Sequence, residues 1–356
     1  MLTSPDRPAQ PAPSAEQSAI GPGRPRSNRS RVGRVRGGRR RYQPHHYLLM
    51  VMGWPVVAAS TALLYLRWQE VDRVYLIAAV ALTPFLAGAL LPASVIAWFS
   101  RSTLLRLATA AVVAVYLYTV APLDAVIDCG PELSERAITI MTANVQVEGG
   151  DPVGIADQVS ALNPDVLFLQ ESSRGFLEVL GRQPELEPWA YRSNQEPGAS
   201  AGVTVWSKWP MSDMRFATLD MERSLEATVA LPDGNIGVVA VHTISPTDRR
   251  GVGRWNEQLT ALARHRFDRP TIMAGDFNAT EDHAPFRNLL NQGWTDSHDD
   301  KGCGLDQTWP TTTMPFPVMR LDHILVSDDF DVLSNEIVKI EGSDHLAVVA
   351  RVEPID

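Results

Sequence analysis

Six short motifs carry polar side chains that suit metal-assisted hydrolysis of a phosphate ester. Carboxylate and amide oxygens are the ligands that Mg²⁺ prefers. An aspartate can orient or deprotonate an attacking water, and a histidine can stabilise charge on phosphoryl oxygens or protonate a leaving group. The motifs place Asn144 in TANVQ, Gln170 and Glu171 in DVLFLQES, His242 in AVHT, Asp276 and Asn278 in AGDFNAT, Asp322 in LDHILVS, and Asp344 and His345 in GSDHLAV.

Each motif alone also has a purely structural explanation. Gln170 and Glu171 could begin a capped helix, and the polar residues of GDFN could hydrogen-bond within their own turn. His242 on an apolar strand is by itself typical of a buried core histidine. His323, next to Asp322, points to the opposite face of its strand and is interpreted as structural. Zinc fits less well, because the sequence has no HExxH helix and no paired-cysteine motif.

The elements that must hold these residues are short strands alternating with helices, from Arg136 onward. Most of the polar motifs stand at strand ends, where ligand-binding loops gather on a rigid scaffold. Many short strands with few helices predict two packed sheets flanked by helices. We expect strands at 137–145, 165–169, 202–206, 225–231, 236–241, 270–274, 321–327, 337–340 and 346–352, and helices at 152–162, 255–267 and 284–291.

The order and spacing of the motifs resemble the endonuclease/exonuclease/phosphatase superfamily, which has the deoxyribonuclease I-like fold. The resemblance covers residues 138–353 and includes Thr308-Trp309-Pro310, shortly before the strand of Asp322. It implies a four-layer α/β sandwich, with two packed mixed sheets flanked by helices. It also implies a phosphoesterase that uses a divalent metal, normally Mg²⁺, with Mn²⁺ as an alternative.

The resemblance further implies a role for each residue. Asn144, Glu171 and Asp344 would serve the metal, and Asp276 would act as the base or orient the water. Asn278 would position the phosphate. His345 would face the scissile phosphate, steadied by Asp322. His242 stands where some branches of the superfamily use histidine and others tyrosine, so its role as a second phosphate contact stays open.

Three apolar stretches precede this region and predict three transmembrane helices. They run over residues 47–66, 74–99 and 103–120, and the first two contain no charged side chain. About 20 mostly apolar residues are needed to cross a bilayer. Buried helices of a soluble domain and a cleaved signal peptide are the alternatives. The first stretch lies too far from the N-terminus for a typical signal peptide.

The charge distribution predicts the orientation in the membrane. The net charge of −9 divides into +9 for residues 1–127, with 14 arginines and five acidic residues, and −18 for residues 128–356. Nine arginines lie between Arg24 and Arg41. Because arginine-rich segments stay in the cytoplasm, three crossings would place the catalytic region outside the cytoplasmic membrane. Two crossings would leave it inside. A nucleic-acid-binding arm is the alternative interpretation of the arginines.

These patterns divide the chain into three parts. Residues 1–44 are predicted to be a disordered cytoplasmic tail, 45–127 a membrane region, and 128–356 the catalytic domain. The two cysteines, Cys129 and Cys303, both follow the apolar stretches. They could pair in an oxidising compartment or stay as thiols, because spacing does not decide connectivity.

The strongly acidic catalytic region is poorly suited to gripping long nucleic acid, which requires Lys and Arg at the phosphates. Its tether to the membrane favours a small or lipid-linked phosphoester, hydrolysed by direct attack of water. A phosphodiester is preferred over a monoester. An extracellular nuclease of the same fold remains an alternative. An inactive, membrane-tethered binding module is a third hypothesis. No motif indicates a protein partner.

Overall fold

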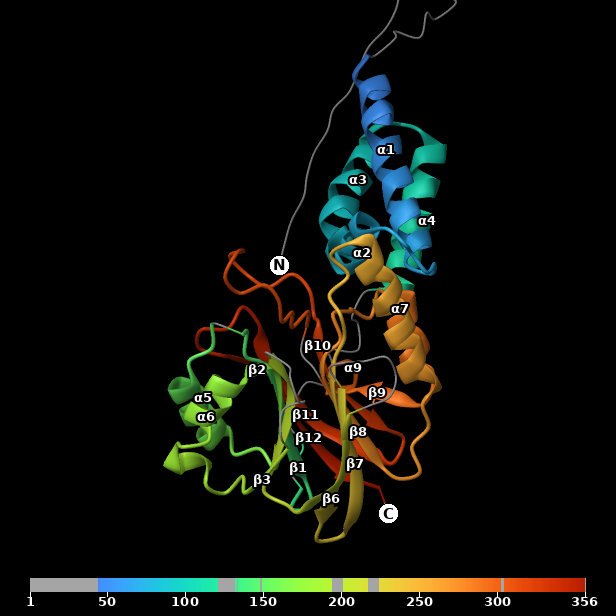
Figure 1. Ribbon diagram of the computed structural model, residues 1–356. Helices are drawn as coiled ribbons and strands as arrows, with labels where there is room; N and C mark the ends of the chain where they lie inside the picture. Colours follow the sequence, from blue (N-terminus) through green and yellow to red (C-terminus); the bar gives the residue numbers. More distant parts are fainter. Residues whose placement is uncertain are drawn as a thin grey trace, which may run out of the picture. The chain divides into compact units, whose positions relative to one another are not determined.

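Two six-stranded sheets pack face to face in the computed structural model (Figure 1). The structure describes residues 44–120, 132, 134–147, 149–193, 201–216, 224–301 and 304–355. The first sheet has the order β11-β12-β1-β2-β4-β3 and the second β5-β6-β7-β8-β10-β9. The strands are β1 Ile138–Asn144, β2 Val166–Ser173, β3 Tyr191–Arg192, β4 Ala201–Ser207, β5 Met211–Phe216, β6 Ser224–Leu231, β7 Gly234–His242, β8 Thr271–Asp276, β9 Trp294–Asp296, β10 Asp322–Ser327, β11 Phe330–Lys339 and β12 Leu346–Pro354.

Both sheets are mixed, and each contains one parallel pair. β1 runs parallel to β2, and β7 runs parallel to β8, while the other paired strands are antiparallel. Alternate side chains of the two sheets meet in a common core that includes Ile140, Phe168, Val238 and Ile324, all fully buried. Burial of both faces explains why these strands are continuous apolar runs in the sequence.

Helices cover the outer face of each sheet. α5 (Pro152–Leu162) and α6 (Arg174–Leu180) pack on the first sheet through Ile155 and Leu180. α7 (Arg249–Arg264) and α8 (Ala284–Leu290) pack on the second through Trp255 and Phe286. The short helices η3 (Pro184–Leu186) and α9 (Ser297–Lys301) complete the set. The prediction of two packed mixed sheets with flanking helices is therefore confirmed.

Several predicted boundaries were wrong. β2 continues through Gln170 and Glu171 to Ser173, because a bulge lets polar residues remain in the strand. β11 begins at Phe330, seven residues before the predicted start. Its solvent-facing residues are polar and conceal the strand in the sequence. α7 begins at Arg249, with Asp248 as its N-cap, and ends at Arg264. β5, β9 and α6 were not predicted.

The apolar stretches form a helical region of different construction. α1 (Pro44–Leu66) is a single helix and α4 spans Thr103–Thr119. The stretch 74–99 is not one straight helix. It divides into α2 (Val74–Ala81), η1 (Thr83–Leu86) and α3 (Ala87–Phe99), with a bend of 64°. The break falls at Pro84, which cannot donate a helical hydrogen bond.

Only α1 is by itself long and apolar enough to cross a membrane, among the described residues. The bent pair α2–α3 would add a second span if it crosses as one unit. α4 has 17 residues, which corresponds to about 26 Å of helix, slightly less than the ~30 Å of a hydrocarbon core. The three predicted spans are therefore not established. Residues 1–43, Cys129 and Cys303 lie outside the described part of the chain.

The order of the helices within the helical region follows from two contacts. His46 Nδ1 lies 3.0 Å from the carbonyl of Phe99, so α1 begins where α3 ends. Arg106 donates to the carbonyl of Trp98, so α4 begins at the same end. Buried residues of α1, α3 and α4, including Val57, Leu90 and Leu105, join the helices into one apolar cluster. α1 and α3 are consequently antiparallel.

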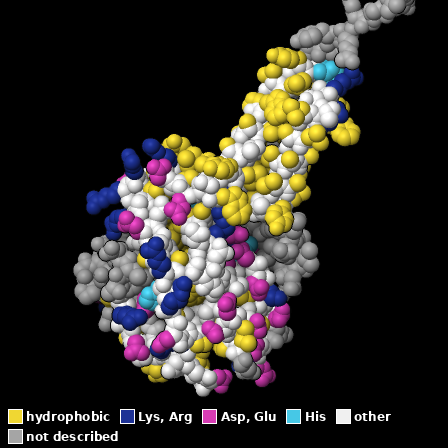
Figure 2. All heavy atoms as spheres, turned by 90° about the vertical axis from the view of Figure 1, so that its right-hand side faces the viewer, with side chains coloured by type: hydrophobic (Ala, Val, Ile, Leu, Met, Phe, Trp, Pro, Cys, Tyr) yellow, Lys and Arg dark blue, Asp and Glu magenta, His cyan; other side chains and the backbone are white. Residues whose placement is uncertain are grey.

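The surface of the helical region is largely apolar (Figure 2). Exposed aromatic side chains occur at both ends. Tyr47, Trp98 and Phe99 mark the end where α1 begins, and Tyr65, Trp68, Tyr75 and Tyr118 mark the other. Exposed Leu91, Val95 and Leu107 lie in the helices between these groups. Aromatic residues at two levels with aliphatic residues between them are typical of membrane-facing surfaces.

The link between α1 and α2 is attached to the β-sandwich by buried polar contacts. Arg67 Nε donates to Asp282 Oδ1 at 2.6 Å, and both side chains are buried. Arg287 donates to the Arg67 carbonyl. His283 Nδ1 accepts from the backbone N–H of Thr280, so its Nε2 carries the proton and donates to the Ile77 carbonyl at 3.1 Å. We call Arg67, Asp282, His283 and Arg287 the anchor cluster.

Candidate active site

The ends of four strands bring the predicted residues together. Asn144 ends β1 and pairs with Gln170 of the parallel strand β2. His242 ends β7 and pairs with Asp276, at the end of β8. Asp322 begins β10 directly opposite Asp276. Because the carboxyl ends of neighbouring parallel strands lie at one edge, residues far apart in sequence meet there.

Backbone geometry turns two of these side chains toward the edge. Glu171 has φ +55°, at the irregularity where the pairing of β2 with β4 shifts between Leu169 and Ser172. A bulge of this kind re-aims a side chain that would otherwise follow the strand alternation. Gly275 has φ +151°, and a Cβ there would lie 1.9 Å from the Val241 carbonyl, so only glycine fits before Asp276.

Asn144 joins the acidic residues. Its Nδ2 donates to Glu171 Oε1 at 3.2 Å and to Asp276 Oδ2 at 3.1 Å. The same two oxygens lie 3.7 Å from His242 Nε2. Asn278 donates its backbone N–H to Asp276 Oδ1 at 2.8 Å. We call these residues, together with Asp322 and His345, the active-site cluster.

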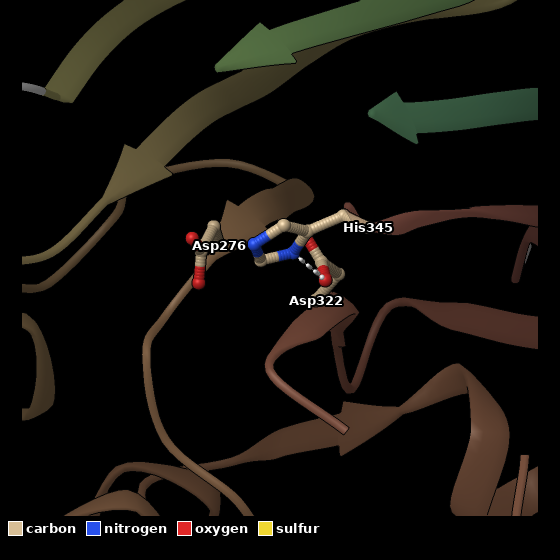
Figure 3. A group of neighbouring side chains, drawn as sticks. All are labelled: Asp276, Asp322 and His345. Carbon is tan, nitrogen blue, oxygen red and sulfur yellow. Dashed lines mark hydrogen bonds and ion pairs between the residues drawn. The ribbon is translucent and has the colours of Figure 1, made fainter. Parts of the chain in front are cut away.

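His345 lies between two carboxylates (Figure 3). Its Nδ1 is 2.8 Å from Asp322 Oδ2, and its other ring nitrogen is turned toward Asp276. Burial alone would lower the pKa of His345, but the charge and hydrogen bond of Asp322 and the charges of Asp276 and Asp344 raise the pKa to about 10. The imidazole is therefore protonated at neutral pH and can donate a proton.

The pKa of Asp276 is also raised, but to a lower value. Burial and the charge of Asp322 raise the pKa of Asp276 to about 7, against the lowering effects of His345, Asn278 and Asn144. A carboxylate with a pKa near neutrality is suited to accept a proton from water. Asp322 Oδ1 is buried and has no hydrogen-bond partner among the described residues. The cluster therefore holds a buried carboxylate oxygen whose hydrogen-bonding capacity is not satisfied by the described residues.

Asp344, also predicted to help hold the metal, has a side-chain partner of its own. Its Oδ2 accepts a hydrogen bond from Trp309 Nε1 at 3.1 Å. It is not part of the group formed by Asp276, Asp322 and His345, whose potential ligand atoms lie within 4.8 Å of one another. The charge of Asp344 still acts on His345, its neighbour in the chain.

Sequence reasoning missed two hydroxyl groups that support the cluster. Ser343 Oγ donates to the Asn144 carbonyl at 2.7 Å and accepts from the His345 N–H. Thr308 Oγ1 accepts from the backbone N–H groups of Leu321 and Asp322. Both belong to motifs that were noticed, Ser-Asp-His and Thr-Trp-Pro, but their partners are distant in sequence. His323 was interpreted correctly as structural, since it is buried between Asp296 and the Ala279 carbonyl.

A comparison with protein-family models identifies the family. Residues 141–345 match the model described as "Endonuclease/Exonuclease/phosphatase family". The chain belongs to the endonuclease/exonuclease/phosphatase family. Members of this family are phosphoesterase hydrolases, and the matched range contains the whole active-site cluster. No match was found among curated proteins.

Solved structures with TM-scores of 0.51 and 0.50 share the fold. Humanized TDP2 of D. rerio is 17% identical, with a TM-score of 0.51 over 62% of this chain and 100% of that chain. Truncated TDP2 of Caenorhabditis elegans is also 17% identical, with a TM-score of 0.50 over 62% and 100%. An endonuclease/exonuclease/phosphatase from Beutenbergia cavernae is 20% identical, with a TM-score of 0.49 over 62% and 72%.

The endonuclease/exonuclease/phosphatase family is generally dependent on divalent metal, and the side chains present suit such an ion. Glu171 and Asp276 direct one oxygen each toward the Asn144 amide, and Asp322 holds an uncompensated oxygen. Asp276, Asp322 and His345 form the tightest group geometrically. Asn144 and Glu171 are further candidate oxygen ligands, at the neighbouring side of the cluster.

Proposed function

We propose that the chain is a membrane-anchored, Mg²⁺-dependent hydrolase of phosphodiester bonds that acts by direct attack of water. The observation that carries the proposal is the meeting of Asp276, whose pKa is raised to about 7, and His345, whose pKa is raised to about 10, in one cluster that also includes the partly buried Glu171. A base that titrates near neutrality beside a protonated histidine meets the requirements of general acid–base hydrolysis.

The residues divide the reaction between them. Asp276 accepts a proton from water, whose oxygen forms a new bond to phosphorus while the bond to the ester oxygen breaks. His345 donates a proton to the departing alcohol, and Asp322 holds its ring in place. Asn278 and His242 contact the phosphate. A divalent ion held by Asn144 and Glu171 supplies positive charge to the phosphoryl oxygens.

The anchoring is proposed from the helical region. α1 begins beside the end of α3, whereas the link after α1 contacts Asp282 of the sandwich. The end of α1 at Leu66 therefore lies on the side of the catalytic domain, and its start at Pro44 lies at the opposite end of the helical region. With α2–α3 and α4 as further crossings, the N-terminus would be cytoplasmic and the catalytic domain extracytoplasmic. The belts of exposed aromatic residues support this proposal.

The first test measures Mg²⁺-dependent cleavage of bis(p-nitrophenyl) phosphate by the full chain. Asp276→Asn should lower kcat/KM about 10²- to 10⁴-fold, because it removes the base. His345→Ala should lower kcat/KM as well, because it removes a cation that stabilises charge on the phosphoryl oxygens. Asp233→Asn is the control, since Asp233 is exposed in the turn between β6 and β7 at the other end of the sheet. Equal rates for all four proteins would show that the site is assigned wrongly.

The metal assignment has its own test. Glu171→Gln should weaken Mg²⁺ binding, measured by calorimetry, at least tenfold, because a neutral amide replaces a charged ligand. An inactive binding module would keep its metal affinity after this substitution. Screening the active protein against DNA, RNA, sphingomyelin, phosphoinositides and nucleotides then separates a small or lipid-linked substrate, which we favour, from nucleic acid.

A further inference from the structure

A cavity of about 260 Å³ adjoins the active-site cluster and shares Glu171 with it. The two oxygens of Glu171 have different partners, since Oε1 accepts from Asn144 Nδ2 and Oε2 from the Val147 backbone N–H, each at 3.2 Å. The carboxylate therefore stands at the boundary between cluster and cavity. The other walls come from the segment after β1 and from α6, with Val145, Gln146, Pro152, Phe176 and Val179.

The lining of the cavity is mainly apolar. Val147 and Val179 are 38% and 41% exposed, so their side chains are accessible to a ligand. Phe176 packs with its inner side against the core of the first sheet. Among the described residues that line the cavity, none is Lys, Arg or His, and Glu171 is the only charged one. An anionic group would be repelled there, whereas an apolar group would displace water from an apolar wall.

Two of the glycines that line the cavity lie where the backbone packs closely. A Cβ at Gly149 would lie 2.5 Å from the Gly342 carbonyl, and a Cβ at Gly150 would lie 2.4 Å from the Val145 carbonyl. Larger residues at these positions would displace the loop. Gly175 is different, because a Cβ there would meet no atom within 4 Å. Since Gly175 also lines the cavity, a side chain at this position can occupy the cavity without a clash.

We infer that this cavity, the Glu171 cavity, binds an uncharged apolar group esterified to the phosphate that is hydrolysed. The inference rests on the proposed function and extends it to the substrate. The group is the arm of the diester that remains on phosphorus after the other alcohol departs. A nucleic acid strand would bring further phosphates to this region, and neutralising them requires basic side chains.

The test compares diesters that differ only in the retained arm. Methyl p-nitrophenyl phosphate and butyl p-nitrophenyl phosphate release the same leaving group. A buried methylene contributes about 0.8 kcal/mol, which corresponds to about fourfold in kcat/KM at full burial. With three additional methylenes, the full chain should hydrolyse the butyl ester at least ten times more efficiently than the methyl ester. Thymidine 5′-p-nitrophenyl phosphate, whose retained arm is a nucleoside, should show no comparable increase in kcat/KM over the methyl ester.

Gly175→Leu fills the Glu171 cavity and provides the decisive variant. It should reduce kcat/KM for the butyl ester to the level of the methyl ester, while the methyl ester changes less than threefold. Gly253→Leu is the matched control, because Gly253 is also an exposed helical glycine whose Cβ would meet nothing within 4 Å. The control should keep the butyl preference.

Three results would count against the inference. Equal kcat/KM for the methyl and butyl esters in the unmodified protein would overturn it. Equal loss of both activities in Gly175→Leu would overturn it too, because position 175 would then affect the cluster and not the arm. Absence of hydrolysis for every diester would overturn the proposed function itself, and the inference with it.

Discussion

One short segment, Asp276–Arg287, contributes to two clusters. It supplies Asp276 to the active-site cluster at one end and Asp282, His283 and Arg287 to the anchor cluster at the other, yet the charges of the two clusters are arranged in opposite ways. In the anchor cluster, Asp282 is paired with Arg67 and both are buried. In the active-site cluster, Asp276 lies close to Asp322, and His345 lies between the two carboxylates. Burial raises the pKa of both Asp276 and Asp282, to about 7 and about 6.

The two buried carboxylates differ in the charges that surround them. Arg67 lowers the pKa of Asp282 through its charge and hydrogen bond, whereas the charge of Asp322 raises that of Asp276 further. In the anchor cluster the paired charges hold Arg67 against Asp282, whereas in the active-site cluster the second carboxylate, Asp322, raises the pKa of Asp276 to about 7, where a carboxylate can accept a proton from water. The segment therefore carries a reactive end and a fixed end.

The largest expected effect, on kcat/KM, follows from removing one carboxylate charge from the active-site cluster. Asp322→Asn removes the charge that raises the pKa of His345, so that pKa should fall. We expect kcat/KM to drop about 10²- to 10⁴-fold and the alkaline limb of its pH profile to move to lower pH. Rates measured from pH 6 to 11 would show both changes. An unchanged alkaline limb would mean that His345 is not the acid.

The next largest effect, on the free energy of unfolding, follows from removing Arg67 from the anchor cluster. Arg67→Met leaves the Asp282 carboxylate buried without its partner, which should reduce the free energy of unfolding by about 3–5 kcal/mol. The double variant Arg67→Met/Asp282→Leu should recover most of this loss, because no charge then remains buried. Denaturation of the full chain in detergent measures both.

Arg73→Ala is the control for this comparison. Arg73 is exposed and pairs only weakly with Asp72, at 3.5 Å, so its loss should change the free energy of unfolding by less than about 0.5 kcal/mol. If Arg67→Met were equally harmless, or if the double variant were no better than Arg67→Met, the link between α1 and α2 would not be anchored through this pair.

The smallest effect concerns pH. The pKa of Asp282 is raised above its ordinary 3.8, so between pH 4 and 6 its contribution to stability decreases as pH rises. Burial lowers the pKa of His283 from 6.5 to about 4, so in nearly the same range its contribution increases as pH rises. The two slopes, each up to about 1.4 kcal/mol per pH unit, oppose one another.

Single substitutions should reveal each slope. In Asp282→Asn, the free energy of unfolding should increase more steeply with pH between 4 and 6.5 than in the unmodified chain. In His283→Gln, the slope should become more negative. Denaturation curves at pH 4, 5 and 6 measure the difference. Parallel pH dependences in all three proteins would contradict the burial of this pair.

The sequence predicted the active-site cluster better than its surroundings. Asn144, Glu171, Asp276 and His345 stand next to apolar runs that fix the strands, so strand ends could be located and their convergence expected. The partners of these residues could not be predicted. Ser343 reaches the carbonyl of Asn144, almost two hundred residues earlier in the chain, and no local pattern reports such a contact.

The anchor cluster had no sequence signal at all. Arg67 directly follows the apolar stretch 47–66, and no motif marks it. Asp282 and His283 follow the GDFN motif but belong to no recognised pattern. Each residue is individually ordinary for a surface loop. Only the packing of Ile77 of α2 into the apolar cluster of the second sheet brings them into a buried environment, where an isolated charge would be costly.

By itself the sequence determined the family and the packed mixed sheets, and it located the polar side chains at the strand ends, because apolar periodicity and motif order are local properties of the chain. The tertiary structure decided the proton affinities of Asp276 and His345, the attachment of Arg67 to Asp282, and the cavity beside Glu171. These properties depend on burial and on distances between segments far apart in sequence, and only the folded chain fixes both.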